Sequence, residues 1–149
     1  DGFGRRIAFN LEIKRPRAGP YPGLEAAVAG EVERRGLLAG TLFSCFYDPV
    51  LAALREASPG ARIGLLVSRR YPARAVARAE ALGAEALHPE AALVDRALVE
   101  EAHAAGLAVH PFTVDDEGAM GRLLDLGVDG LFTNVPARMR ALVDARRQS

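Results

Sequence analysis

Short apolar runs rich in β-branched and aromatic residues alternate with longer segments of helical periodicity along the whole chain. The apolar runs cover residues 7–14, 41–46, 62–68, 85–88, 107–114 and 130–134, and we expect each to form a strand that a helix follows. Their starts are 34, 21, 23, 22 and 23 residues apart, which is about one βα unit each. The pattern therefore predicts one α/β domain of about six βα units over residues 1–149.

Helix boundary signals agree with this division. Asp48 is expected to cap one helix that has Pro49 in its first turn, and Asp95 and either Asp115 or Asp116 can cap later helices. Glycines follow four helical segments, where a left-handed residue often ends a helix: Gly36, Gly83, Gly106 and Gly127.

Two architectures fit such a repeat: an open doubly wound sheet and a closed (β/α)₈ barrel. A barrel needs eight strands and roughly 250 residues, so six units would leave two unpaired strand edges. In a barrel we expect this chain to supply strands three to eight, with two units upstream.

The first strand has a polar face. Alternate side chains of a strand share a face, so Asn10, Glu12 and Lys14 point away from Leu11 and Ile13. Lys14 is the only lysine in the chain. Because burying charges is costly unless they pair, bind a metal or meet a ligand, this strand is a candidate site.

Composition narrows the class of partner. The 149 residues include 19 basic and 19 acidic side chains, so no net field attracts nucleic acid, and we expect a small-molecule substrate. No apolar stretch is long enough to span a bilayer. The single Cys45 suits a reducing cytoplasm, although the start at Asp1 leaves room for an upstream signal peptide. Exposed strand edges would favour a homo-oligomer.

Several short motifs, in order, resemble the later part of the glycerophosphodiester phosphodiesterase family. The resemblance runs from residue 7 to about residue 137 and rests on five pieces: residues 10–14 (NLEIK), 44–46 (SCF) with 54–59 (LREASP), 88–89 (HP), 113–114 (TV) and 127–136 (GVDGLFTNVP).

This resemblance implies a TIM barrel that uses Ca²⁺ or Mg²⁺ to hydrolyse glycerophosphodiesters to glycerol 3-phosphate and an alcohol. It implies that Glu12 binds the metal and that Lys14 contacts the substrate phosphate, both as catalytic residues. Chemistry agrees, since a carboxylate suits these hard cations and Lys14 lies about 7 Å further along the same face. The other reading of Glu12 and Lys14 is an internal salt bridge in a barrel layer.

The family motifs that precede this region are not in the sequence. They comprise a histidine-arginine-glycine, a glutamate-x-aspartate and a histidine-aspartate segment, and they supply further metal ligands and the two histidines that act as general acid and base. One carboxylate does not hold a six- to eight-coordinate cation. We therefore expect this chain alone to be inactive.

The remaining candidates are histidines and an aromatic residue. His88 ends a short strand and is a candidate for contacting substrate, with His110 as a weaker one. His103 is expected on a solvated helix or at its end. Phe112 stands where the family usually has tryptophan, and either packing or substrate contact explains it.

Other positions also depart from the family pattern. Cys45 replaces a serine and is expected to be a small buried thiol. Asp115 replaces an asparagine, and Asn134 replaces an aspartate. Arg69 and Arg70 are expected to be solvated surface charges.

Two alternative functions remain open. One is a non-catalytic phosphate-binding or scaffold barrel, completed by another chain. The other is a related phosphodiesterase that acts on lysophospholipids or sphingolipids.

Overall fold

A computed structural model describes residues 7–14, 19 and 21–148 of the chain. Its centre is a five-stranded parallel sheet in the order β1-β2-β3-β4-β5. The strands are β1 (Phe9–Glu12), β2 (Thr41–Cys45), β3 (Arg62–Val67), β4 (Ala86–Pro89) and β5 (Ala108–Val109). The α/β class predicted from the sequence is confirmed, and the strands follow one another in sequence order as predicted for consecutive βα units.

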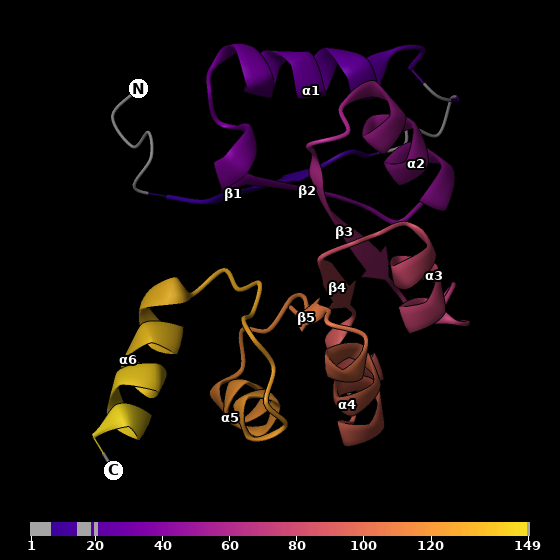
Figure 1. The fold of residues 1–149 in the computed structure, drawn as a ribbon. Helices are drawn as coiled ribbons and strands as arrows, with labels where there is room; N and C mark the ends of the chain where they lie inside the picture. The colour runs from indigo at the N-terminus through magenta and orange to yellow at the C-terminus, as the bar shows by residue number, and fades with distance from the viewer. Residues whose placement is uncertain (1–6, 15–18, 20, 149) are drawn as a thin grey trace.

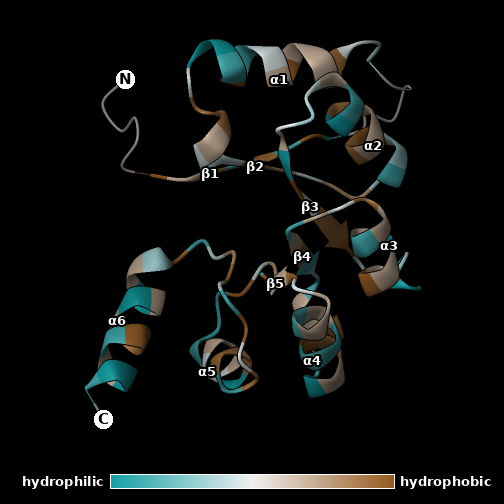
Figure 2. Ribbon diagram, in the orientation of Figure 1, coloured by the Kyte–Doolittle hydropathy of each residue, from teal (hydrophilic) through white to brown (hydrophobic). Residues whose placement is uncertain are grey.

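Helices lie along the outer side of the curved sheet (Figure 1). They are α1 (Leu24–Arg34), α2 (Asp48–Ala57), α3 (Ala75–Ala81), α4 (Arg96–Ala104), α5 (Glu117–Asp125) and α6 (Pro136–Arg147), with short 3₁₀ turns η2 (Leu38–Gly40) and η3 (Ala91–Leu93). In Figure 2 the strands β2 and β3 are mainly hydrophobic, whereas the helices carry both hydrophobic and hydrophilic residues. Helices α1 to α5 each contribute buried side chains to the core, whereas α6 contributes none that is fully buried.

The core lies between the outer face of the sheet and these helices. Phe43 of β2 and Ile63 and Leu65 of β3 are fully buried, as are Leu51 and Leu54 of α2. Strands buried on both faces are typical of parallel sheets, and they explain the near-continuous apolar run of β3.

The predicted sixth strand, residues 130–134, is not a regular strand, although it lies beside β5. Phe132 donates a backbone hydrogen bond to Pro111 (2.9 Å). The Asp129 carboxylate, rather than a backbone carbonyl, accepts from the N–H of Val109 (2.7 Å). Pro111 has no N–H to donate. A regular ladder therefore cannot form on this side of β5, and the expectation of six strands is corrected to five plus an irregular segment.

Helix starts match the sequence in part. Asp95 and Asp116 cap α4 and α5 by accepting from the backbone of Leu98 and Ala119, both at 2.8 Å. The expectation that Asp48 caps α2 is wrong, because Asp48 is the first residue of the helix. All four glycines predicted to end helices have positive φ: Gly36, Gly83, Gly106 and Gly127.

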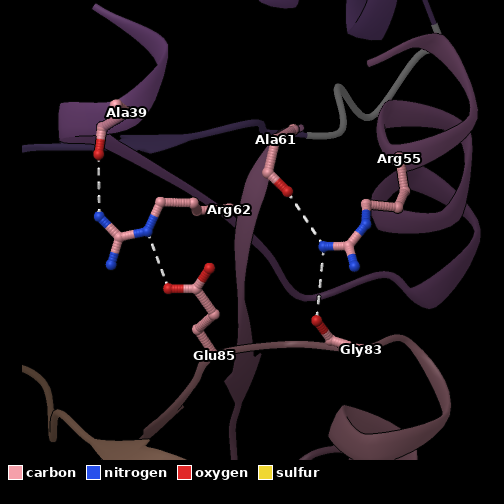
Figure 3. Close-up of polar contacts among 6 residues, drawn as sticks. All are labelled: Ala39, Arg55, Ala61, Arg62, Gly83 and Glu85. Atoms are coloured by element: carbon pink, nitrogen blue, oxygen red, sulfur yellow. Dashed lines mark hydrogen bonds and ion pairs between the residues drawn. The ribbon is translucent and has the colours of Figure 1, made fainter. Parts of the chain in front are cut away.

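Two arginines fasten the edge of the sheet where the strands begin (Figure 3). Arg55 of α2 donates to the carbonyl oxygens of Ala61 (3.0 Å) and Gly83 (3.4 Å), which precede β3 and β4. Arg62 binds Glu85 (2.8 Å) and a carbonyl group of η2 (3.1 Å). Arg55 belongs to one of the motifs that carry the family resemblance, and its contacts here are structural.

Gly64 of β3 lets the ring of His88 cross the inner face of the sheet. A Cβ atom at Gly64 would lie 2.9 Å from Cε1 and 3.0 Å from Nε2 of His88, whose side chain is fully buried and has little room to move. We predict that Gly64→Ala lowers the free energy of unfolding by about 1–3 kcal/mol through overpacking, measured by urea denaturation.

Gly30→Ala is the matched control. Gly30 lies within α1, and nothing lies within 4 Å of an added Cβ, so the substitution should be neutral or stabilise by up to about 1 kcal/mol. Equal denaturation midpoints for the two variants would show that His88 yields to the new methyl group.

Candidate functional site

The carboxyl ends of the parallel strands meet at one edge of the sheet, and the candidate residues of β1 lie there. Glu12 is the last residue of β1 and pairs in register with Ser44 of β2. One step back on the same face, the amide of Asn10 donates to the hydroxyl of Ser44 (3.1 Å). The Nζ of Lys14 lies 3.8 Å from Oε2 of Glu12.

Glu12 and Lys14 are accessible to a ligand in the part of the chain that the structure describes. Their side chains are 34% and 79% exposed, so they do not fill a packed layer here. An ion pair as exposed as this contributes little to stability. Its ammonium and carboxylate groups can therefore exchange partners at small cost when a phosphate or a cation arrives.

The residues at this edge supply only part of the ligands that a divalent cation needs. Glu12 offers the hard oxygen that Ca²⁺ and Mg²⁺ prefer. Within the described residues, however, no group of three or more His, Cys, Asp or Glu side chains is arranged to hold a metal ion. Any cation at Glu12 would take its other ligands from water, substrate or residues outside this region.

An aromatic pair stands at the same edge. Phe46 follows β2 and Phe112 follows β5, and their rings meet edge to face with centroids 5.8 Å apart. Since β3 and β4 separate these two strands in the sheet, the contact shows that the sheet curves and that its inner face is concave. The sequence indicated Phe112 as a candidate but not its contact with Phe46, because local sequence patterns carry no information about a contact between residues more than sixty positions apart.

His88 lies deeper than this edge. It is fully buried on the inner face, with its Nε2 3.2 Å from Nδ1 of His110. Both histidines line a cavity of about 250 Å³ with Asn10, Arg62 and Phe132. The structure thus places Glu12, Lys14 and Phe112 at the edge of the sheet and His88 below it.

Burial keeps the two inner histidines neutral. It lowers the pKa of His88 to about 3, and the neighbouring His110 adds to the shift. Burial also lowers the pKa of His110, against the opposite pull of Asp129. His103 is near the end of α4, as expected, and its Nε2 lies 3.0 Å from the Asp129 carboxylate. None of the three histidines is shown in contact with Glu12 or Lys14.

Asp115 and Asn134, the two exchanged positions, contact each other. The amide Nδ2 of Asn134 donates to Oδ2 of Asp115 (2.9 Å), and its backbone N–H donates to Oδ1 (2.8 Å). The hydroxyl of Thr133 also donates to Oδ1 (3.0 Å). These hydrogen bonds, led by the Asn134 amide, lower the pKa of Asp115. The family resemblance implies an asparagine in place of Asp115 and an aspartate in place of Asn134, so the two exchanges would together retain an amide–carboxylate pair.

Cys45 and Arg69 have the structural surroundings expected of them. The Cys45 thiol is buried, and burial raises its pKa, which makes it a poor nucleophile. Arg69 is exposed and pairs with Glu90, a residue just beyond β4 that the sequence did not indicate (2.7 Å). Glu90 carries no recognisable motif, and only its position beside Phe112 brings it to the edge of the site.

A parallel α/β sheet whose carboxyl edge carries a carboxylate and an ammonium group side by side has the arrangement on which enzymes of the (β/α) barrel class build their active sites. A family comparison gives the more particular assignment. Residues 6–138 match the model of the glycerophosphoryl diester phosphodiesterase family, and the chain belongs to this family.

Individual relatives agree. The chain is 28% identical over 145 residues to a glycerophosphodiester phosphodiesterase of Bacillus subtilis, covering 91% of this chain and 49% of that protein. It is 30% identical to one of Bacillus altitudinis, covering 87% and 53%. The chain therefore spans about half the length of the curated relatives it matches.

Solved structures share the fold. A protein of Silicibacter pomeroyi described as a glycerophosphoryl diester phosphodiesterase superposes with a TM-score of 0.87 at 26% identity, covering 97% of this chain and 53% of that one. A phosphodiesterase of Oleispira antarctica, in complex with the product sn-glycerol-3-phosphate, gives 0.74 at 29% identity, with 92% and 55% covered. Among the described residues, no helix has the length and apolar character needed to cross a membrane.

The buried histidine predicts a dependence of stability on pH. The folded-state pKa of His88, about 3, lies below its ordinary 6.5, so between these values the unfolded chain binds a proton that the folded chain does not. Stability is then complete above pH 6.5 and falls as the pH falls, by about 1.4 kcal/mol per pH unit for one such group. Urea denaturation between pH 7 and pH 4 should show this slope.

His88→Gln should flatten the slope, since glutamine does not titrate. Phe132→Leu is the control, because its ring lies 4.9 Å from that of His88 and its loss disturbs the same cluster without removing a titrating group. A slope that is unchanged in His88→Gln would contradict the assignment.

The reciprocal exchange predicts non-additive effects of mutation. Asn134→Asp places a second carboxylate against Asp115 and should lower the denaturation midpoint, and Asp115→Asn should lower it by removing the charged acceptor. The double variant restores one amide and one carboxylate, so its midpoint should exceed that of Asn134→Asp. Additive losses in the double variant would show that the two side chains act separately.

Proposed function

We propose that this chain is the C-terminal part of a metal-dependent phosphodiesterase that hydrolyses glycerophosphodiesters to sn-glycerol 3-phosphate and an alcohol. The observation that carries the proposal is the pair of Glu12 and Lys14, exposed 3.8 Å apart at the carboxyl edge of the sheet, in a chain that belongs to this family. The product complex of the relative from Oleispira antarctica supports the substrate class.

Each side chain of the pair has a separate role. Glu12 would be one ligand of a Ca²⁺ or Mg²⁺ ion, which would supply a Lewis acid for the phosphate oxygens when bound. The Lys14 ammonium would bind the phosphate and offset the negative charge that develops on it in the transition state. Phe112 would form an aromatic wall for the substrate, whereas His88, fully buried and neutral, would line the inner cavity below the site.

Completion of the barrel is part of the proposal. The chain would supply strands three to eight of a TIM barrel, with residues 130–134 in the place of the last strand. Two further βα units would pair with the open edge of β1 and bring the remaining metal ligands and the proton-transfer pair. We propose a cytoplasmic enzyme. In residues 1–149 alone, where those two units are lacking, a second copy of the chain could pair with the edge of β1 instead.

Turnover of glycerophosphocholine in Ca²⁺ or Mg²⁺ tests the function. We expect hydrolysis by the full-length product of the gene that encodes this chain, and none by residues 1–149 alone. Robust turnover by residues 1–149 would contradict the requirement for further proton-transfer residues. An inactive full-length protein that still binds glycerol 3-phosphate would favour the non-catalytic phosphate-binding barrel.

Variants of the pair test the two roles in the full-length protein. Lys14→Met should lower kcat by about 10²- to 10³-fold through lost transition-state stabilisation, and Lys14→Arg should recover part of it. Glu12→Gln should raise the metal concentration needed for half-maximal activity. Glu80→Gln, an exposed carboxylate of α3, is the matched control and should change neither quantity. A metal requirement unaltered in Glu12→Gln would contradict its role as a ligand.

A further inference from the structure

A second, larger pocket lies beside the candidate site, between the start of α2 and the loop that leads to α3. Its volume is about 740 Å³, and its walls include Phe46, Tyr47, Tyr71, Arg70 and Arg78. Three of the five are aromatic, and such walls with a few polar groups are typical of small-molecule subsites. Neither the family resemblance nor the Glu12–Lys14 pair accounts for this pocket.

The pocket opens at the same edge of the sheet as Lys14. Glu12 and Ser44 are register partners, and the N–H of Ile13 donates to the carbonyl of Ser44 (2.8 Å), so the pairing continues past the end of β1. Lys14 and Phe46 each lie two residues further on, so they are level on neighbouring chain segments. If Lys14 holds the phosphate of a diester, one of the two ester substituents would therefore extend along Phe46 into this pocket.

Arg78 of α3 fixes the shape of the pocket. Its Nε and Nη2 bind the two carboxylate oxygens of Asp48 (2.9 and 2.5 Å), and its Nη1 binds the carbonyl oxygen of Tyr71 (3.3 Å). These bonds tie the start of α2 to the loop. The hydrogen bond from Arg78 also lowers the pKa of Asp48, and the bidentate pairing neutralises its charge locally.

Arg70 gives the pocket a positive charge. Its guanidinium carbon lies 5.6 Å from the centre of the Tyr71 ring, and no carboxylate of a described residue lies within ion-pair distance of it. A cluster of three aromatic rings would otherwise suit a quaternary ammonium group. Here a cation of the protein already occupies that position over Tyr71, and the acidic residue nearby is paired.

We propose that this pocket seats the leaving alcohol of the diester and selects alcohols that carry an anionic group, which Arg70 binds, over cationic alcohols such as choline. The apolar walls would hold the carbon chain of the alcohol, while the guanidinium would bind a carboxylate or a phosphate by charge-assisted hydrogen bonds. This inference rests on the proposed function for its assignment of the alcohol, and on the pocket itself for its charge preference.

Two substrates that differ by one carboxylate test the preference. Glycerophosphoserine is glycerophosphoethanolamine with a carboxylate added to the alcohol, and glycerophosphocholine provides the cationic comparison. We expect kcat/KM of the full-length protein to be on the order of 10-fold higher for the serine diester than for the ethanolamine diester, as one charged hydrogen bond would give.

Variants locate the effect at Arg70. Arg70→Gln should bring kcat/KM for the serine diester to that for the ethanolamine diester, and Arg70→Lys should retain part of the preference. Arg122→Gln, at an exposed arginine of α5, is the matched control and should keep the full preference.

Tyrosine fluorescence supplies a readout that does not need turnover. The sequence has three tyrosines and no tryptophan, and two of the three line the pocket, so binding of the serine diester to residues 1–149 should change the emission in wild type and not in Arg70→Gln.

The two proposals can fail separately. An equal kcat/KM for the serine and ethanolamine diesters, a preference for choline, or a preference that survives in Arg70→Gln would overturn the assignment of the pocket while leaving the phosphodiesterase in place. If no diester is hydrolysed, the proposed function falls, and an Arg70-dependent fluorescence response to the serine diester would still support the charge preference of the pocket.

Discussion

The parallel hydrogen-bond ladder from β1 to β5 is the constraint on which the other features depend. Since all strands run in one direction, every connection has to return along the outer side, and the helices take that place. The carboxyl ends of the strands then gather at one edge. Glu12 ends β1, Phe46 follows β2 and Phe112 follows β5, so the ladder together with the curvature of the sheet brings these residues to one edge.

Uncharged groups pack against one another on the inner face of the curved sheet. Gly64 makes room for the ring of His88, which in turn lies against His110 and Phe132. A protonated His88 would be buried beside His110 with no carboxylate among the causes that set its pKa, so the folded state favours its neutral form.

Charges at the carboxyl edge differ in what they already bind. Asp48 and Arg78 satisfy each other in a bidentate pair, whereas Glu12 and Lys14 form a single, exposed contact. Arg70 rests over a ring rather than on a carboxylate. The first pair shapes the pocket, and the loosely held groups remain able to bind a ligand. Sequence proximity does not reveal this difference, because Arg78 is thirty residues from Asp48.

The sequence by itself determined the βα rhythm, the polar face of β1 and the family, because local periodicity and short motifs specify each of them. It located Glu12 and Lys14 for the same reason, since they share a face of a single strand. Only the tertiary structure decided that residues 130–134 lie beside β5 without forming a strand. The regular ladder is interrupted there because the Asp129 carboxylate accepts the hydrogen bond of the Val109 N–H and because Pro111 has no N–H to donate. It likewise decided that Asp115 meets Asn134 and that His88 is sealed inside, since such contacts depend on how distant segments pack.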